Sequence, residues 1–104
     1  VSRTIAKQPR EVARVHDPRS GRVLTLTSAQ PGLQFYSGNF LDGTTVGKSG
    51  HVYRQGDASV LEPQLFPDTP NQPSFGSARL VPGKQYVNRM VYRFTTDQGA
   101  RATP

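Results

Sequence analysis

The stretch 17-DPRSGRVLTLTS-28 decides the fold, because it places turn residues directly before a strictly alternating run. Asp-Pro followed by Ser-Gly favours a tight turn, since proline fixes φ and glycine tolerates a positive φ. In the run that follows, Leu24 and Leu26 point to one side of an extended chain, and their neighbours point to the other. Together with a short extended run over residues 11–17, this stretch predicts an antiparallel β-hairpin.

Three further segments are typical of strands: residues 33–37, 59–66 and 87–96. The glycine-spaced residues 38–58 between two of them predict a long connection without regular structure of its own. A helical period is not sustained over eleven residues anywhere in the sequence. The sequence therefore predicts an all-β, antiparallel fold of about five or six strands, a sandwich or part of one.

The composition narrows the function classes. Only 34% of the 104 residues are hydrophobic, which is little for a hydrophobic core. The fold is therefore either small and rich in loops, or its core depends on a part that is absent from this chain. The formal net charge of +6 comes from scattered Lys and Arg residues, which indicates solubilising surface charge rather than a nucleic-acid site. Cysteine is absent, and no apolar stretch approaches the ~18 residues of a membrane span. Residues 1–10 and 97–104 are expected to be loose ends.

The first candidate for chemistry is Glu62, which directly precedes Pro63 in 61-LEPQLFPDTPN-71. A residue before proline is restricted to extended backbone, and proline cannot donate to a sheet ladder. Alternation then puts Val60, Glu62 and Gln64 on one face, whereas the residues that can fill a core lie on the other: Leu61, Pro63 and Leu65. A carboxylate held in this way suits general-base catalysis. The alternative is an ordinary solvated glutamate at a strand end.

A second candidate, Gln34, shares one face of the segment 33–37 with Tyr36. An amide side chain offers both donors and an acceptor, which suits a sugar hydroxyl, although an exposed strand glutamine is the simpler interpretation. His16 and His51 have no second histidine or spaced acid with which to form a metal site. Phosphate-loop, dinucleotide and nucleophile-elbow motifs are absent, and we expect no metal site.

Taken together, four blocks of this sequence resemble the C-terminal part of the aldose 1-epimerases, also called galactose mutarotases. They occur in the family's order and with near-family spacing, and the resemblance covers roughly residues 11–96. The blocks are 20-SGRVLTLTSAQPGLQFYSGNFLDGT-44, 47-GKSGHVY-53, 61-LEPQLFPDTPNQPSF-75 and 79-RLVPGKQYVNRMVYRF-94.

The resemblance implies a portion of a large antiparallel β-supersandwich and an isomerase without a cofactor. The family interconverts the α and β anomers of free hexoses such as galactose and glucose. A glutamate removes the proton of the anomeric hydroxyl, a histidine from the middle of the chain protonates the ring oxygen, and the opened ring recloses as the other anomer. Glu62 occupies the position of that base in the L-E-x-Q-x-x-P-D-x-x-N motif. Gln34 matches the sugar-binding glutamine of the Q-F-Y-x-G-N motif.

The resemblance also implies that the general acid and most sugar ligands are absent from this chain, because neither His16 nor His51 aligns with the family's acid. We therefore expect residues 1–104 to be a C-terminal fragment, completed by an N-terminal segment or a companion chain. The alternative is a non-catalytic carbohydrate-binding β-module. The family's usual location is the cytoplasm, and an exported periplasmic form would have lost its leader before Val1. Neither nucleic acid nor membrane is an expected partner.

Overall fold

The computed structural model describes residues 8–98, and strands dominate this region. Two single-turn 3₁₀ helices lie between the last two strands. The strands are β1 (Arg10–Asp17), β2 (Arg22–Ser28), β3 (Gly32–Tyr36), β4 (Thr45–Val46), β5 (Val52–Tyr53), β6 (Val60–Gln64) and β7 (Met90–Thr96), and the helices are η1 (Thr69–Asn71) and η2 (Pro73–Phe75).

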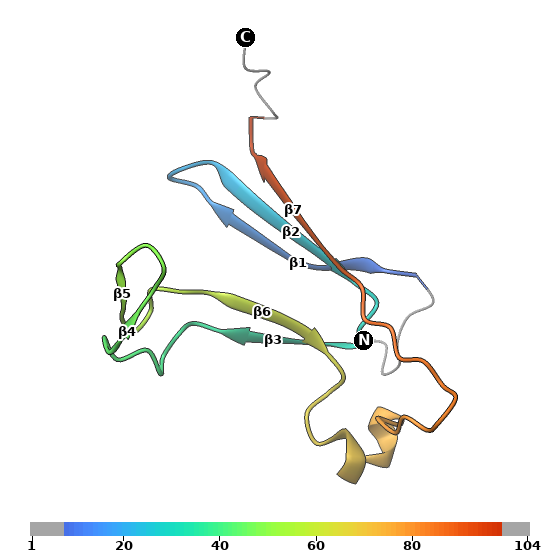
Figure 1. The fold of residues 1–104 in the computed structure, drawn as a ribbon. Coiled ribbons are helices and arrows are strands. Elements are labelled where there is room, and N and C mark those ends of the chain that lie inside the picture. The colour runs from blue at the N-terminus through green and yellow to red at the C-terminus, as the bar shows by residue number, and fades with distance from the viewer. Residues whose placement is uncertain (1–7, 99–104) are drawn as a thin grey trace.

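The strands form three antiparallel sheets (Figure 1). The largest has the order β1-β2-β7, so its third strand is contributed by a segment far along the sequence. The pairs β3-β6 and β4-β5 form the other two. The β1-β2-β7 and β3-β6 sheets approach each other where β7 begins, and they diverge toward the β1–β2 turn (Figure 1). The predicted all-β, antiparallel class is confirmed.

The β1–β2 hairpin forms as predicted from the turn residues between its strands. Gly21 has a φ of 70°, and its amide donates to the Asp17 carbonyl over 2.8 Å. The Asp17 carboxylate accepts hydrogen bonds from the Ser20 hydroxyl at 2.6 Å and the Arg19 amide at 3.1 Å. An L side chain at position 21 would be strained and would also meet Asp97, which fixes glycine at this corner.

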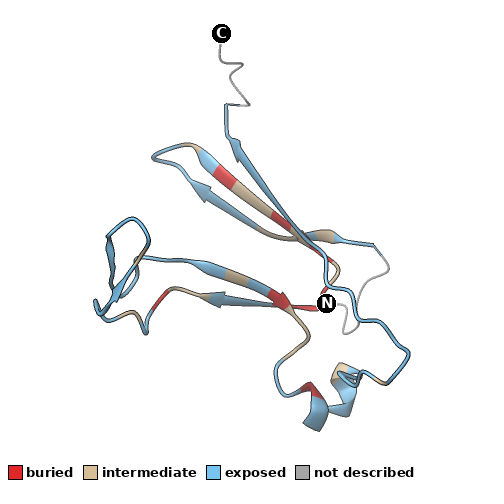
Figure 2. Ribbon diagram, viewed as in Figure 1, coloured by how far each residue is buried: buried red, intermediate tan, exposed pale blue. Residues whose placement is uncertain are grey.

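The hydrophobic core of the described region is very small. Figure 2 shows buried residues as short segments, mainly in β2 and at the ends of β3 and β6. Among residues 8–98, Val23 and Leu26 are the buried hydrophobic side chains. The Cα radius of gyration is 17.6 Å, against about 13 Å for a compact domain of ~100 residues. The sheets therefore present large apolar surfaces that residues 8–98 leave uncovered.

Hydrogen bonds between polar groups link the β1-β2-β7 and β3-β6 sheets at the end where the two sheets approach each other. The Gln30 side chain is fully buried between β2 and β3, and its Nε2 donates to the Tyr86 hydroxyl over 2.7 Å. The main-chain amide of Gln30 donates to the Ser28 hydroxyl. The Arg10 guanidinium donates to the main-chain carbonyl of Gln30 over 3.1 Å. In the segment before β7, the side-chain amide of Asn88 donates to the Pro63 carbonyl. These bonds fix the start of β3 relative to β7 and β6.

Three sequence-based expectations need correction. Residues 38–58 contain the small β4–β5 hairpin, which was predicted as a connection without regular structure. The last strand begins at Met90 rather than at residue 87, because its partner β2 ends at Ser28, opposite Met90. The predicted loose ends were too wide, since Arg10 lies in β1 and Asp97 pairs with Gly21. Residues 1–7 and 99–104 lie outside the described region.

Candidate functional site

The two candidate residues lie directly opposite each other on neighbouring strands. In the antiparallel pairing of β3 with β6, Gln34 is the partner of Glu62. Directly opposed residues project to the same face of a sheet, with Cβ atoms about 4.5–5.5 Å apart. Both side chains are exposed. A carboxylate and an amide that are distant in the sequence thus share one small polar surface.

The sequence of β6 explains why Glu62 points to this surface. Pro63 is buried and lies opposite Leu33, so it occupies the other face of the two-stranded sheet. The Pro63 carbonyl accepts from Asn88 at 3.4 Å, and the Leu61 carbonyl accepts from the Tyr92 hydroxyl at 3.4 Å. Both flanking residues of Glu62 are therefore tied to the segment that carries β7. Because successive side chains alternate, the Glu62 carboxylate lies on the face opposite to Leu61 and Pro63.

The Glu62 carboxylate is unengaged within residues 8–98, where no hydrogen bond or ion pair involves it. Gln34 uses one of its amide protons locally, donating to the Phe35 carbonyl over 3.2 Å. Its side-chain oxygen and second amide proton remain for a ligand. The surface therefore offers a proton acceptor next to a group that both donates and accepts hydrogen bonds.

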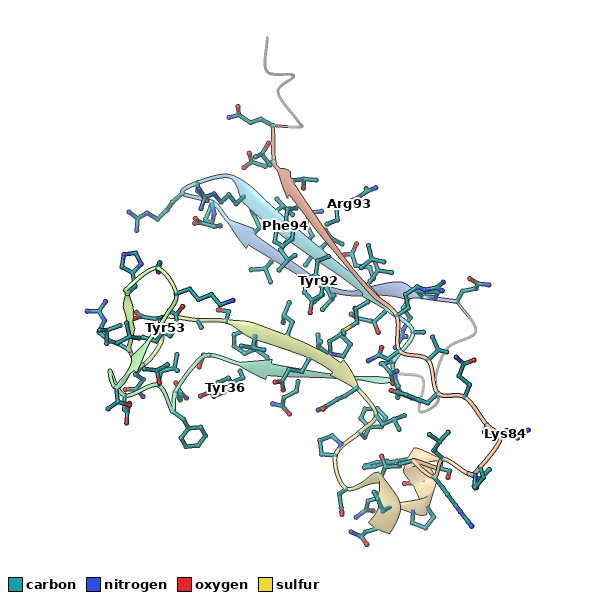
Figure 3. The ribbon with its side chains drawn as sticks, viewed as in Figure 1. Tyr36, Tyr53, Lys84, Tyr92, Arg93 and Phe94 are labelled. Atoms are coloured by element: carbon teal, nitrogen blue, oxygen red, sulfur yellow. The ribbon has the colours of Figure 1, made fainter. Side chains whose placement is uncertain are left out.

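An aromatic pair that the sequence analysis did not assign adjoins this polar surface. Tyr36 lies two residues beyond Gln34 on the same face of β3, opposite Val60 (Figure 3). Its ring stacks on that of Phe40 with centroids 6.2 Å apart, and its hydroxyl accepts the Phe40 amide at 2.8 Å. The turn at Gly38, with φ 73°, returns the chain toward Tyr36. The sequence feature that could have predicted this pair is the position of Tyr36 and Phe40 directly on either side of 37-SGN-39.

The two histidines are placed in other parts of the fold. His16 lies near the β1–β2 turn, where its Nε2 is 3.2 Å from the Asp97 carboxylate. His51 lies on the β4–β5 hairpin, with Nδ1 3.2 Å from the Ser49 hydroxyl. Within residues 8–98, neither forms a hydrogen bond or an ion pair with Glu62 or Gln34. In the described part of the chain, no three His, Asp or Glu residues cluster as metal ligands would.

Downstream of Glu62, Asp68 organises the proline-rich turn. It adopts a left-handed backbone with φ 64°, and its carboxylate accepts from Asn71 at 2.6 Å and Gln72 at 3.0 Å. These two hydrogen bonds, the one from Asn71 foremost, lower the pKa of Asp68 below 3.8. A lowered carboxyl pKa stabilises the fold above the unfolded pKa, and the stabilisation is lost as the pH falls through the folded value.

We expect Asn71→Ala to raise the pKa of Asp68 toward its ordinary value, because the variant removes the main donor to the ionised carboxylate. The measurement is a pH titration of the Asp68 side-chain carbon by NMR. Asn39→Ala is the matched control, since Asn39 accepts from Ser37 in a different loop. An Asp68 titration that shifts equally in both variants would show that Asn71 is not the cause.

The sequence of this chain matches a known protein family. The sequence model of the family described as aldose 1-epimerase matches residues 2–93, nearly the whole chain. The chain belongs to the aldose 1-epimerase family. Glu62, Gln34 and the Tyr36–Phe40 pair all lie within the matched region. The resemblance inferred from the four sequence blocks is thereby confirmed.

Individual relatives agree with this assignment. The chain is 47% identical to galactose mutarotase of Rattus norvegicus and 48% identical to that of Bos taurus, in each case over 90 residues. These matches cover 86% of this chain and 26% of the relative. It is 36% identical to aldose 1-epimerase of Escherichia coli K12 over 76 residues, which are 71% of this chain and 22% of the relative. The chain thus spans about a quarter of the length of the curated relatives it matches.

The antiparallel strands of this aldose 1-epimerase family chain fit the β-sandwich predicted from the sequence. Within residues 8–98, no helix has the length and apolar character needed to cross a bilayer.

Proposed function

We propose that this chain supplies the catalytic base of a mutarotase, which interconverts the α and β anomers of hexoses such as galactose and glucose. Glu62 is the base, and Gln34 binds hydroxyl groups of the sugar. The names of the relatives, galactose mutarotase and aldose 1-epimerase, support this reaction class. The proposal needs no metal and no redox cofactor, because the reaction only moves protons and breaks and re-forms one C–O bond.

The observation that carries the proposal is the register of β3 and β6, which sets Gln34 opposite Glu62. An ionised glutamate is an acceptor only, and a neighbouring amide can hold an adjacent sugar hydroxyl by donating or accepting. A sugar placed on this surface can therefore be oriented by one strand and deprotonated by the other. Such orientation contributes to catalysis because the sugar and the base lose little further translational and rotational entropy when they react.

The proposed reaction begins when the Glu62 carboxylate removes the proton of the anomeric hydroxyl. The electrons of that O–H bond form the aldehyde C=O, the bond between the anomeric carbon and the ring oxygen breaks, and a general acid protonates the ring oxygen. Rotation about the bond next to the aldehyde presents its other face. The same steps in reverse return the proton from Glu62 and close the ring as the other anomer.

The general acid in this proposal comes from outside the chain. His16 is engaged with Asp97 and His51 with Ser49, and within residues 8–98 neither forms a hydrogen bond or an ion pair with Glu62 or Gln34. We propose that an N-terminal segment or a companion chain supplies the acid and further sugar ligands, with residues 1–104 as the C-terminal part. A non-catalytic carbohydrate-binding module is the second candidate, since an exposed Gln34 beside the Tyr36–Phe40 pair could bind sugar without the acid.

A mutarotation assay tests this assignment. Freshly dissolved α-galactose is followed by polarimetry with the 104-residue chain alone, and then with the chain refolded with the part of bovine galactose mutarotase outside the 90 matched residues. We expect the buffer rate from the chain alone and a rate well above buffer from the mixture. The matched bovine segment, refolded with the same partner, is the positive control.

Two outcomes would contradict the assignment. A rate well above buffer from the chain alone would show that no external acid is required. A mixture that stays at the buffer rate while the bovine control is active would reject mutarotase function for this chain. Sugar binding by such an inactive mixture, measured by NMR, would then favour the carbohydrate-binding module.

A further inference from the structure

The face of the β3-β6 sheet that carries Glu62 is polar at one end and apolar at the other. The register gives this face three directly opposed pairs: Gly32–Gln64, Gln34–Glu62 and Tyr36–Val60. Because glycine has no side chain, the first two pairs present only polar side chains. The third pair sets an aromatic ring opposite a β-branched residue, and Val60 is 36% exposed. A ligand held at Glu62 and Gln34 therefore has its apolar neighbours at the Tyr36 end.

Tyr36 lies within reach of a ligand at Glu62. Diagonal neighbours on one face of an antiparallel pair are about 7–8 Å apart, a distance that aromatic and long side chains can bridge. Glu62 and Tyr36 are diagonal neighbours, because Tyr36 pairs with Val60, two residues before Glu62. A pyranose with its substituents spans a similar length. A sugar with one hydroxyl at the Glu62 carboxylate can therefore touch the Tyr36 ring with its far end.

The Tyr36 side chain is held at both ends before any ligand binds. Its backbone lies in β3, and its hydroxyl accepts the Phe40 amide at 2.8 Å (Figure 3). The two rings stack with centroids 6.2 Å apart and an interplanar angle of 25°. A side chain that is already fixed loses little conformational entropy when a ligand binds. Tyr36 is therefore a preorganised contact surface.

Stabilisation of the turn after β3 accounts poorly for this pair on its own. Phe40 is 91% exposed, so the stack removes little of its apolar surface from water. The Tyr36 hydroxyl accepts from Phe40 but donates no hydrogen bond to any other residue of the range 8–98. An aromatic ring whose polar tip keeps a free donor is typical of surfaces that bind ligands.

We infer that Tyr36 is a sugar-binding residue that favours galactose over glucose. Its ring packs against C–H groups of the pyranose while the anomeric hydroxyl lies at Glu62. In galactose, O4 is axial and leaves the hydrogens on C3, C4 and C5 on one face, where they form a continuous apolar patch. In glucose the hydrogen on C4 lies on the opposite face, so the patch is divided. The inference rests on the proposed function, because it takes Glu62 and Gln34 as the place where the sugar binds.

Kinetics of the reconstituted enzyme test this role, with the chain refolded with the part of bovine galactose mutarotase outside the matched residues. Tyr36→Thr removes the ring and keeps a residue type that suits a strand. We expect KM for galactose to rise about 3- to 10-fold, as for the loss of one aromatic contact, and KM for glucose to change less than about 2-fold. The kcat values should stay nearly constant, because the contact involves parts of the sugar that do not react.

Two further variants are the controls for the kinetics. Tyr36→Phe keeps the ring and should retain the preference for galactose. Tyr53→Thr is the matched control, since Tyr53 is 40% exposed and lies opposite Thr45 in the separate β4-β5 sheet. It should leave both KM values unchanged. The inference is overturned by an unchanged KM for galactose in Tyr36→Thr, by an equal rise for both sugars, or by the same effect in Tyr53→Thr.

Saturation-transfer NMR detects the contact without turnover. The reconstituted Glu62→Gln variant carries protonated tyrosine in the 104-residue chain only, and is otherwise deuterated. Saturation of the tyrosine ring protons in the presence of excess galactose should pass chiefly to the hydrogens on C3, C4 and C5. This transfer should disappear when Tyr36→Thr is added. Transfer that persists in the double variant, or that is absent before it, removes the contact.

The role of Tyr36 and the mutarotase assignment can fail separately. A reconstituted enzyme that is active, but shows neither the KM shift nor the transfer, rejects the role of Tyr36 and keeps the assignment. A mixture that transfers saturation from Tyr36 to galactose without mutarotation supports the contact and rejects the assignment. A mixture that shows neither transfer nor mutarotation, while the matched bovine segment is active with the same partner, rejects both.

Discussion

In the reconstituted enzyme, Glu62→Gln is expected to lower kcat about 10²- to 10⁴-fold, the usual contribution of a positioned general base. Glutamine keeps the size and shape of the side chain but cannot accept the proton of the anomeric hydroxyl. KM should change little, since the variant keeps Gln34, the residue proposed to bind the sugar hydroxyls. Mutarotation of α-galactose, followed by polarimetry over a range of sugar concentrations, separates the two constants.

The matched control for this prediction is Glu11→Gln, a second exposed strand glutamate, which lies on β1 and outside the β3-β6 sheet. We expect it to leave kcat unchanged. If the reconstituted enzyme with Glu62→Gln retained the activity of the unmodified reconstituted enzyme, Glu62 could not be the base. If both variants lost activity equally, the loss would reflect charge or folding rather than proton transfer, and circular dichroism of each variant distinguishes these causes.

The local elements were predictable because their sequence signals are strong and short-ranged. Turn residues at 17–21 followed by strict alternation gave the β1–β2 hairpin with its boundaries almost correct. Alternation alone also placed Glu62 and Gln34 on the polar faces of their strands. What it could not supply was the register between β3 and β6, because these strands are not consecutive in the sequence. The direct pairing of Gln34 with Glu62 is therefore a finding of the structure.

The elements that the sequence analysis missed are too short to show a period. The strands β4 and β5 have two residues each, and in their hairpin the Tyr53 side chain lies against Gly47. The helices η1 and η2 are single turns, each with a proline among its first residues. Periodicity needs a longer window than any of these provides.

The functional assignment depended on resemblance more than on pattern. From spacing alone, Glu62 was an ordinary exposed glutamate and Gln34 an exposed strand residue. The four blocks gave them roles, and the family match over residues 2–93 confirmed the resemblance, while the roles themselves stay proposals. The Tyr36–Phe40 pair was missed because Phe40 lies outside β3, in the turn that follows this strand. Only the turn at Gly38 brings the two rings together.

Leu26→Ala is expected to destabilise the fold by about 2–5 kcal/mol, the range for large-to-small substitutions in a core. Leu26 is fully buried in the central strand β2, between Ala13 of β1 and Tyr92 of β7. Val23 is the other buried hydrophobic residue of the described region, so few neighbours can relax into the space. A domain of this size has only about 5–15 kcal/mol of stability in total, and the loss is a large share of it.

Urea unfolding followed by circular dichroism measures this prediction, with a lower midpoint and an unchanged m value as the expected result. Leu80→Ala is the matched control, because Leu80 is 60% exposed in the segment before β7 and its truncation should cost less than about 0.5 kcal/mol. Equal shifts would mean that β2 is not the centre of the fold. A large shift for Leu26 alone would show that the β1-β2-β7 sheet is a cooperative unit centred on β2.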